Sequence, residues 1–314
     1  MRALVIGGGG FAGRHLIGKL SQNTGLDVFG TKLKGENTDE FFGIDFSELN
    51  IIEPDAVLSV IDRVKPDFVY QLAAQSSAAL AWKLPKKTFD VNVGGTLNIL
   101  EALKKTAFKG RLLFIGSAEE YGKIIPECLP ISESCETQPT NIYALSKLTA
   151  ERLCLLYKQV HSLEVICVRA FNHIGPFQGE SFAASDFSKQ LIEIEKGLKE
   201  PAVHVGNLEA VRDFTDVRDV VRAYMLLMEK GFSGEVYNVG GGTVCSVRKI
   251  LELLIKLSGI KAEIIIDKSR LRPTDTPEYY ADISKLVSHT GFSHEYALER
   301  TLKDVLDYWR KKVN

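Results

Sequence analysis

The chain has 314 residues, of which 45% are hydrophobic and 25% charged. This is the average for a folded globular protein and excludes a disordered, collagen-like or coiled-coil chain. Its 39 Lys and Arg residues nearly balance its 40 Asp and Glu residues, so no broad basic field is present to bind nucleic acid.

The first half of the chain alternates short apolar runs with amphipathic helical stretches. The predicted strands are apolar throughout, as in parallel sheets that are covered on both faces: Ala3–Ile6, Asp27–Thr31, Phe68–Leu72, Arg111–Ile115 and Val165–Arg169. The predicted helices between them are Phe11–Leu20, Asp55–Val64, Phe89–Leu103 and Tyr143–Tyr157. This alternation predicts an α/β fold with a doubly wound parallel sheet.

The second half is less regular. Its predicted elements are helices at Val217–Glu229, Val247–Leu257 and Leu298–Lys311 and a strand at Val236–Val239. We expect a doubly wound α/β domain over residues 1–169, joined by about 217–240. Residues 170–216 and 241–314 then form a smaller C-terminal α/β lobe.

A glycine-rich turn follows the first predicted strand directly. Gly7, Gly10 and Gly13 form GxxGxxG, with Phe11 and Ala12 inside the motif. At a strand-to-helix turn, such glycines permit the tight turn, the approach of the backbone to a pyrophosphate and close helix–strand packing. The motif predicts a dinucleotide site at residues 7–13.

The end of the second predicted strand bears on the choice of cofactor. A site selective for NAD usually has an acidic residue about twenty residues after the glycines, whereas this chain has Lys32 and Lys34 there. Lysines attract a 2′-phosphate, so we expect NADP(H) to be preferred and NAD(H) to be possible. Both lysines could instead be a solvated strand end. We also expect Asp45 and Phe46 to line the adenine pocket.

Tyr143 and Lys147 are four residues apart and share one face of a predicted helix. A nearby ammonium group stabilises a phenolate and lowers the pKa of the tyrosine, which can then exchange a proton with a substrate oxygen. Ser117 follows a predicted strand at the carboxyl edge of the sheet, where such folds bind their ligands. The three residues are predicted to be catalytic.

The combined motifs resemble the extended short-chain dehydrogenase/reductase family, along essentially the whole chain. They are GxxGxxG, Ser117, Tyr143xxxLys147 and Asn92-Val93-Gly94-Gly95-Thr96. The resemblance implies a Rossmann domain with a C-terminal lobe that binds the sugar-nucleotide substrate. It also implies a nicotinamide beside Tyr143, cofactor contacts at Leu72, Ala73, Ala74 and Asn92, and a role for Asn92 in ordering the central helix. The family often has His where this chain has Gln71, which leaves the role of Gln71 open.

Several segments look like those of family members that process GDP-mannose. The resemblance implies a GDP-sugar substrate, with Asn172 and Arg212 at the diphosphate and a second arginine at Arg272. It also implies substrate contacts at Gln75, Ser117, Glu119 and Asn207. Arginine suits diphosphate binding because its planar fork of donors matches phosphate oxygens, although Arg212 could instead pair with Asp213 or Asp216.

The resemblance favours NAD(P)H-dependent reduction of the C4 keto group of GDP-4-keto-6-deoxy-D-mannose to GDP-6-deoxy-D-mannose. GDP-mannose 4,6-dehydration and nucleotide-sugar 4-epimerisation are the alternatives. A dehydratase needs an acid and a base after the fourth strand of the Rossmann sheet. The sequence there is Ser117-Ala118-Glu119, in which Ala118 cannot transfer a proton, whereas Glu119 stands at the position of the dehydratase base.

Other features concern the surroundings of the protein. The sequence has no signal-peptide core and no apolar run of about 18 residues, so we expect a cytoplasmic protein without a membrane span. Its five cysteines form no CxxC pair, and its six histidines show no metal-ligand spacing; we expect reduced thiols and no metal. Apolar residues on more than one face of Asn92–Lys104 and Tyr143–Tyr157 predict a homodimer with a four-helix interface. The alternative is that these faces pack only within the chain.

Overall fold

The computed structural model describes residues 1–41, 43–270 and 277–313. Its centre is a seven-stranded sheet in the order β10-β6-β5-β4-β1-β2-β3, and every neighbouring pair in it is parallel. This order confirms the predicted doubly wound Rossmann fold. The strands are β1 Arg2–Ile6, β2 Asp27–Lys32, β3 Asp45–Glu48, β4 Phe68–Gln71, β5 Arg111–Ile115, β6 Glu164–Ala170 and β10 Val236–Val239.

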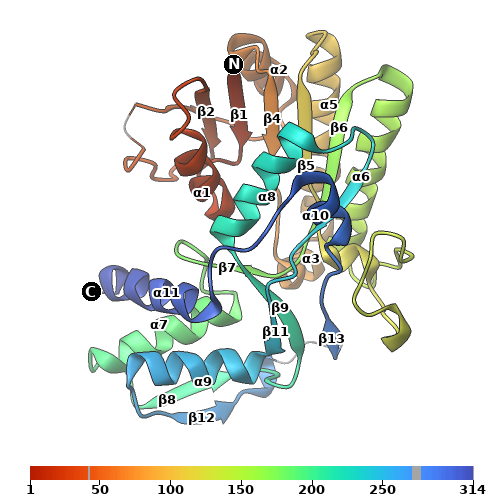
Figure 1. Cartoon of the computed structure of the whole chain (residues 1–314). Helices are drawn as coiled ribbons and strands as arrows, with labels where there is room; N and C mark the ends of the chain where they lie inside the picture. The colour runs from red at the N-terminus through yellow and green to blue at the C-terminus, as the bar shows by residue number, and fades with distance from the viewer. Residues whose placement is uncertain (42, 271–276, 314) are drawn as a thin grey trace.

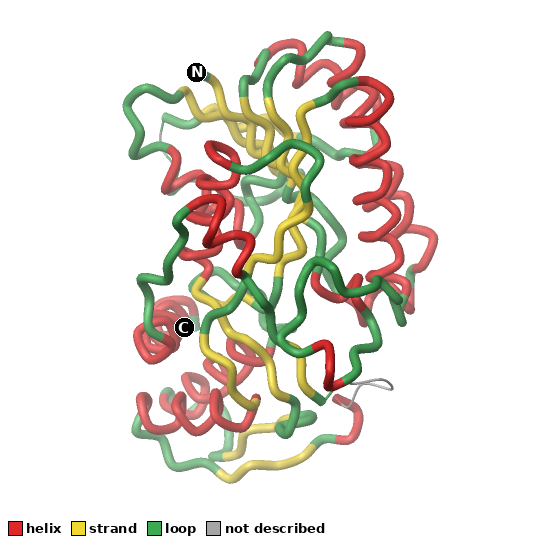
Figure 2. The backbone as a smooth tube through the Cα atoms, turned by 45° about the vertical axis from the view of Figure 1, so that its right-hand side comes forward, coloured by secondary structure: helices red, strands yellow, loops and turns green. Residues whose placement is uncertain are grey.

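Helices cover both faces of this sheet (Figures 1 and 2). Helices α1 (Phe11–Leu20), α8 (Val217–Lys230) and α10 (Ser284–Thr290) pack on one face, around a core that includes Leu16 and Tyr224. On the other face lie α2 (Pro54–Val64), α5 (Gly95–Lys105) and α6 (Ile142–His161), with Leu100 and Cys154 in their core. The sheet is therefore buried on both sides, which explains the mainly apolar sequences of its central strands.

A smaller part of the molecule lies at the carboxyl edge of the sheet (Figure 1). It has its own apolar core, to which Phe187, Leu251 and Trp309 contribute. Its elements are α7 Ala183–Glu195, β8 Ala202–Val205, β9 Val211–Asp216, β11 Thr243–Ser246, α9 Val247–Ser258, β12 Glu263–Ile266, β13 Glu278–Tyr279 and α11 Leu298–Lys312.

Most elements expected from the sequence are present within one or two residues of their predicted ends. One predicted helix, Phe89–Leu103, is a π-helical turn at Asp90–Gly94 followed by α5. The sequence analysis missed β3, α7 and the strands β8, β9, β11, β12 and β13. The remaining short elements are α3 Ala78–Lys83, α4 Pro85–Phe89, η2 Ala118–Tyr121, η3 Pro126–Cys128, β7 His173–Ile174 and η4 Lys268–Arg270.

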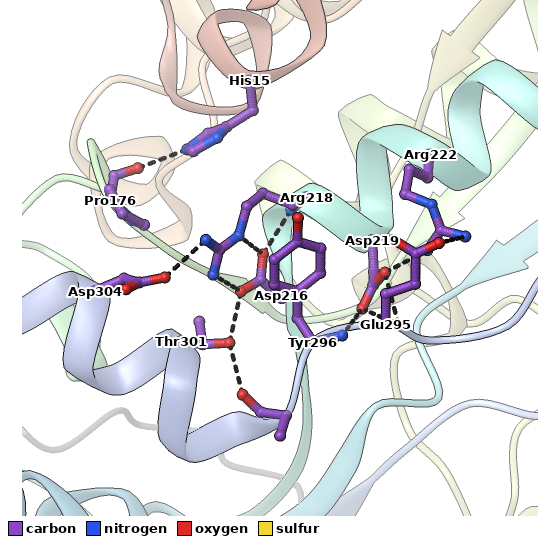
Figure 3. Close-up of polar contacts among 11 residues, drawn as sticks. His15, Pro176, Asp216, Arg218, Asp219, Arg222, Glu295, Tyr296, Thr301 and Asp304 are labelled. Carbon is purple, nitrogen blue, oxygen red and sulfur yellow. Dashed lines mark hydrogen bonds and ion pairs between the residues drawn. The ribbon is translucent and has the colours of Figure 1, made fainter. Parts of the chain in front are cut away.

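A polar network joins the two parts at the start of α8 (Figure 3). The buried carboxylate of Asp216 accepts hydrogen bonds from the amide of Arg218 at 2.7 Å and from the hydroxyl of Thr301 on α11 at 2.6 Å. Arg218 also pairs with Asp304 of α11 at 2.7 Å. These contacts fix α11 against α8 and so orient the smaller part on the sheet.

No helix within the described ranges is long and apolar enough to cross a membrane. In the same ranges, no three His, Cys, Asp or Glu side chains gather in a group that could hold a metal ion.

Candidate active site

A cleft of about 1800 Å³ runs along the carboxyl ends of the main strands and into the smaller part. Its wall begins at the glycine turn after β1, passes the ends of β2, β4, β5 and β6, and reaches α7. This is where open parallel sheets bind their ligands. The residues of the sequence analysis that line it are Gly7, Gly10, Phe11, Ala12, Gly13, Lys32, Lys34, Leu72, Ala73, Ala74, Ser117, Glu119, Tyr143, Lys147, Asn172, Asn207 and Arg212.

The glycine turn has the geometry of a pyrophosphate site. Gly7 has φ +89°, and a Cβ atom there would lie 2.6 Å from the amide nitrogen of Ala73, so only glycine fits. A Cβ at Gly13 would lie 2.2 Å from the carbonyl oxygen of Gly7. The first turn of α1 contains no acidic residue, which leaves its amide groups suited to an anion. These features fit a dinucleotide.

Two lysines and one carboxylate occupy the cleft wall beyond β2. The ammonium group of Lys32 donates to the hydroxyl of Thr38 at 3.3 Å, and the exposed Lys34 follows. Glu36 accepts a hydrogen bond from the amide of Leu33 at 2.9 Å, with its carboxylate beside Gly9. The sequence analysis did not identify Glu36, which lies close to the end of β2.

Asp45 and Phe46 are not among the residues that line the cleft. Asp45 pairs with Arg63 at 2.6 Å, and the Phe46 ring packs against Gly30, where a Cβ atom would meet it at 2.5 Å. The last residue of β3 and the segment after it, residues 48–53, line the cleft instead.

Asn92 and Gln75 also lie behind the wall rather than in it. The side-chain oxygen of Asn92 accepts from the Gln75 amide at 2.8 Å, and its NH₂ group donates to the Ser146 hydroxyl of α6 at 2.9 Å. Asn92 therefore connects the π-helical turn with the helix that carries Tyr143. Gln71 is buried and donates to the hydroxyl of Thr96 at 2.6 Å.

Ser117, Tyr143 and Lys147 meet at the cleft floor. Each is at least nine-tenths buried yet lines the cleft. Ser117 is the N-cap of η2, and its hydroxyl accepts a hydrogen bond from the amide of Glu119 at 3.2 Å. Burial lowers the pKa of Lys147 to about 8.

The expectation that Lys147 lowers the pKa of Tyr143 is wrong for this structure. Burial, followed by the negative charge of Glu119, raises the pKa of Tyr143, and a hydrogen bond with Ser117 lowers it only in part. The Lys147 ammonium group instead donates to the carbonyl of Ile115 at 2.6 Å. Tyr143 is thus held as a neutral phenol, which is the form that can donate a proton.

Glu119 lies on the cleft wall beside these groups. Its carboxylate accepts a hydrogen bond from the side chain of Asn141 at 2.8 Å. Asn141 is the N-cap of α6 and also accepts from the amide of Ala144, so one residue both starts the helix and orients Glu119. Asn141 stands two residues before the predicted start of this helix at Tyr143, and Asn near a helix start is a cap signal that the sequence analysis did not use.

Aromatic side chains close the cleft between the two parts. The ring of Phe11 stacks on that of His173, with centroids 5.6 Å apart and planes 9° apart. Burial lowers the pKa of His173, so its ring is neutral. Tyr224 of α8 also lines the cleft, and its buried hydroxyl has no hydrogen-bond partner among the described residues.

The far end of the cleft is polar. Asn172, Asn207 and Arg212 line it, and the Arg212 guanidinium donates to the carbonyl of Val211 at 2.7 Å. Asp186 of α7 pairs there with Arg270 at 2.5 Å; sequence reasoning missed both residues. Arg272 lies outside the described residues.

Comparisons with known proteins agree with this geometry. Residues 4–305 match the family model described as GDP-mannose 4,6 dehydratase. The chain is 36% identical to GDP-6-deoxy-D-mannose reductase of Pseudomonas aeruginosa, over 84% of this chain and 86% of that one.

Two solved structures have nearly the same fold. RMD from Pseudomonas aeruginosa, complexed with NADPH, has a TM-score of 0.89 at 33% identity, with 99% of each chain covered. UDP-glucose 4-epimerase from Thermotoga maritima, with UDP-glucose, has a TM-score of 0.90 at 28% identity, with 100% of each chain covered. The chain is therefore an NAD(P)-dependent nucleotide-sugar enzyme of the oxidoreductase type, and it belongs to the GDP-mannose 4,6-dehydratase family within the extended short-chain dehydrogenases/reductases.

Proposed function

We propose that the enzyme reduces the C4 keto group of GDP-4-keto-6-deoxy-D-mannose to give GDP-6-deoxy-D-mannose. One observation carries the proposal: two hydroxyl groups, on Ser117 and Tyr143, lie at the cleft floor with the buried Lys147. The residue after Ser117 is Ala118, which cannot transfer a proton. Ketone reduction needs a proton donor and an oxyanion partner, which these hydroxyls supply. The identity to the Pseudomonas reductase supports this choice.

Each of the three residues has a defined task. Tyr143 donates its phenolic proton to the C4 oxygen, and the hydroxyl of Ser117 donates a hydrogen bond to the same oxygen. Lys147 places positive charge one helical turn away and donates to the nicotinamide ribose. When bound, the reduced nicotinamide supplies the hydride that adds to C4. Hydride and proton together convert the ketone into a secondary alcohol.

We assign the cofactor as NADP(H), with NAD(H) accepted less well. Gly7, Gly10 and Gly13 bring the backbone to the pyrophosphate, with Leu72, Ala73 and Ala74 alongside. The end of β2 has two positive charges, on Lys32 and Lys34, and one negative charge, on Glu36. The carboxylate of Glu36 accepts a hydrogen bond from the amide of Leu33. The local charge therefore favours a 2′-phosphate.

The polar far end of the cleft suits a guanosine diphosphate. Arg212, with Asn172 and Asn207 nearby, meets the diphosphate charge. We assign Asp186, which lines the cleft and pairs with Arg270, to the guanine base. Guanine presents its ring N1–H and its exocyclic NH₂ as donors on one edge, so a carboxylate can accept from both, whereas uracil offers a single N–H there.

Dehydration of GDP-mannose is the second candidate, because Glu119 lies on the cleft wall with its carboxylate oriented by Asn141. A base in that position could remove the C5 proton. However, Ala118 supplies no acid for the departing hydroxyl, which favours the reductase.

We also propose that the enzyme is a homodimer through α5 and α6, which lie side by side. Their outer faces expose apolar side chains: Leu97 is 38% exposed, Leu145 46%, Leu156 50% and Val160 61%. Pairing with the same helices of a second copy would bury them in a four-helix interface.

A panel of substrates tests the reaction. GDP-4-keto-6-deoxymannose with NADPH should give cofactor oxidation and GDP-6-deoxymannose, whereas GDP-mannose with NADP⁺ should give no keto sugar. UDP-glucose, with and without NAD⁺, should remain unchanged. Formation of keto sugar from GDP-mannose would establish the dehydratase instead.

A further inference from the structure

A fully buried carboxyl group lies directly behind the catalytic serine. Glu120 of η2 is 0% exposed. Its Oε1 accepts a hydrogen bond from the backbone amide of Ser117 at 2.7 Å, and a Cβ atom at Gly116 would lie only 2.4 Å from it. Its Oε2 has no hydrogen-bond partner among the described residues, which is unusual for a buried oxygen.

Glu120 shares one arginine, Arg169, with a second buried carboxyl group, Glu151. The charges of these three residues do not balance if both carboxyl groups are ionised. Arg169 bonds both oxygens of Glu151, at 2.9 and 2.8 Å. Its Nε is 3.6 Å from Oε2 of Glu120, too far for a hydrogen bond. One guanidinium thus faces two buried carboxyl groups, and a second full negative charge there is costly.

A single proton resolves both anomalies. Burial and the charge of Glu151 raise the pKa of Glu120 well above its usual range. A proton on Oε2 can be donated to Glu151, whose carboxylate lies within hydrogen-bonding reach, and this gives the partnerless oxygen a partner. Oε1 still accepts from Ser117. The Glu120–Glu151–Arg169 cluster is then neutral as a whole.

We infer that Glu120 is a positioning residue of the reaction and that it works as a protonated acid, hydrogen-bonded to Glu151 through one oxygen and to the Ser117 amide through the other. It acts on the substrate only through Ser117 and through Tyr143 and Lys147 of α6. The bond to the amide fixes the backbone from which the Ser117 hydroxyl projects. The proton removes a negative charge that would otherwise lie beneath the site.

That missing charge matters to catalysis. An ionised Glu120 would raise the pKa of both Tyr143 and Lys147 and so make the phenol a poorer proton donor. The other titratable and charged groups around Glu120 come from every element packed on it: Glu119 and Tyr121 of η2, Glu151 and Cys154 of α6, Cys167 and Arg169 of β6, and Tyr279 of β13.

The first test asks directly for the proton. Glu120→Gln keeps an oxygen for the Ser117 amide and an N–H for Glu151. Glu127→Gln is the control, because it removes an exposed carboxylate from η3. The infrared spectrum of the wild-type protein in D₂O at neutral pH should contain the carbonyl band of a buried protonated carboxyl group. The band should vanish in Glu120→Gln and persist in Glu127→Gln. An unchanged spectrum in Glu120→Gln would overturn the inference.

The second test is kinetic, and it rests on the proposed reduction. Glu120→Gln should keep kcat within about twofold of wild type and leave the alkaline limb of the kcat–pH profile in place. Glu120→Leu, which loses the acceptor for Ser117, should lower kcat about tenfold with the Kd for NADPH unchanged. A shift of the alkaline limb to lower pH in Glu120→Gln would mean that wild-type Glu120 is ionised, and it would overturn the inference.

The two tests separate the possible failures. If Glu120→Leu does not fold, the infrared spectrum and the pH profile of Glu120→Gln still decide. If no sugar nucleotide is reduced, the proposed function fails, while the infrared result still establishes or refutes the protonated acid.

Discussion

The ammonium group of Lys147 donates a hydrogen bond to the carbonyl of Ile115 at a distance of 2.6 Å. This contact connects the second turn of α6 to the last residue of β5. Ser117 follows Ile115 by two residues, and Tyr143 precedes Lys147 by one turn of the helix. The bond therefore holds together the two elements that carry the serine and tyrosine hydroxyls.

Replacing Tyr143 tests its role as the proton donor. Tyr143→Phe removes the phenolic hydroxyl and should lower kcat by about 10²–10³-fold, with the Kd for NADPH unchanged by fluorescence titration. Tyr157→Phe is the matched control, because Tyr157 lies on the same helix but bonds Glu101 and is outside the cleft-lining set. A fully active Tyr143→Phe would remove Tyr143 from the mechanism.

The choice between the two nicotinamide cofactors depends on Lys32. Lys32→Ala should raise KM for NADPH about tenfold, which corresponds to about 1.4 kcal/mol of lost attraction to the 2′-phosphate. KM for NADH should stay the same, because NADH has no phosphate there. The exposed Lys19, at the last turn of α1, gives the control Lys19→Ala. Equal effects on both cofactors would contradict the assignment.

Asp213 makes stability depend on pH in a known direction. Burial raises its pKa from 3.8 to about 6, although its carboxylate accepts from the amides of Gly241 and Ala281. The folded state therefore holds this proton at higher pH than the unfolded state does. The contribution of Asp213 to stability is fully present below pH 3.8 and is lost as pH rises through about 6, a change of about 3 kcal/mol.

The substitution Asp213→Asn should abolish that dependence. Relative to wild type, its free energy of unfolding should rise from about pH 4 to about pH 7, as measured by denaturant titration at each of these two pH values. Asp39→Asn changes an exposed carboxylate and should show no such trend. A constant difference between Asp213→Asn and wild type across the window would refute the assignment.

The dimer prediction concerns Leu97 on α5 and Leu156 on α6. The double variant Leu97→Lys and Leu156→Lys places charges in the proposed interface and should convert a two-chain species into a monomer in sedimentation experiments. Leu198→Lys, which changes an equally exposed leucine elsewhere (55%), should leave the dimer intact. A wild-type protein that sediments as a monomer would show that the apolar faces have another role.

The fold could be predicted where local pattern and tertiary environment agree. Strands β1 and β5 are apolar at every position after their first residue because helices cover both faces of the sheet, and the sequence shows this directly. Strand β3, with the sequence Asp45-Phe46-Ser47-Glu48, lies at the sheet edge and has a polar composition, so it carries no such signal. Helix α7 follows a segment rich in glycine and was interpreted as irregular.

The site was predictable where its chemistry depends on spacing. The interval between Tyr143 and Lys147, and the glycines before α1, follow from backbone geometry alone. The direction of the Tyr143 pKa does not, because it depends on burial and on Glu119, which the fold brings near. The pairing of Glu120 with Ser117 likewise depends on the turn of η2, and no periodicity in the sequence signals it.

The fate of the hydride tests the central claim most directly. The enzyme is incubated with GDP-4-keto-6-deoxymannose and NADPH that carries deuterium at nicotinamide C4, once on each face, and the product is examined by NMR. One of the two labelled cofactors should place a single deuterium on C4 of GDP-6-deoxymannose, with one cofactor oxidised per sugar. Product without deuterium at C4 from both labelled cofactors, or keto sugar formed from GDP-mannose without net cofactor oxidation, would contradict the proposed reduction.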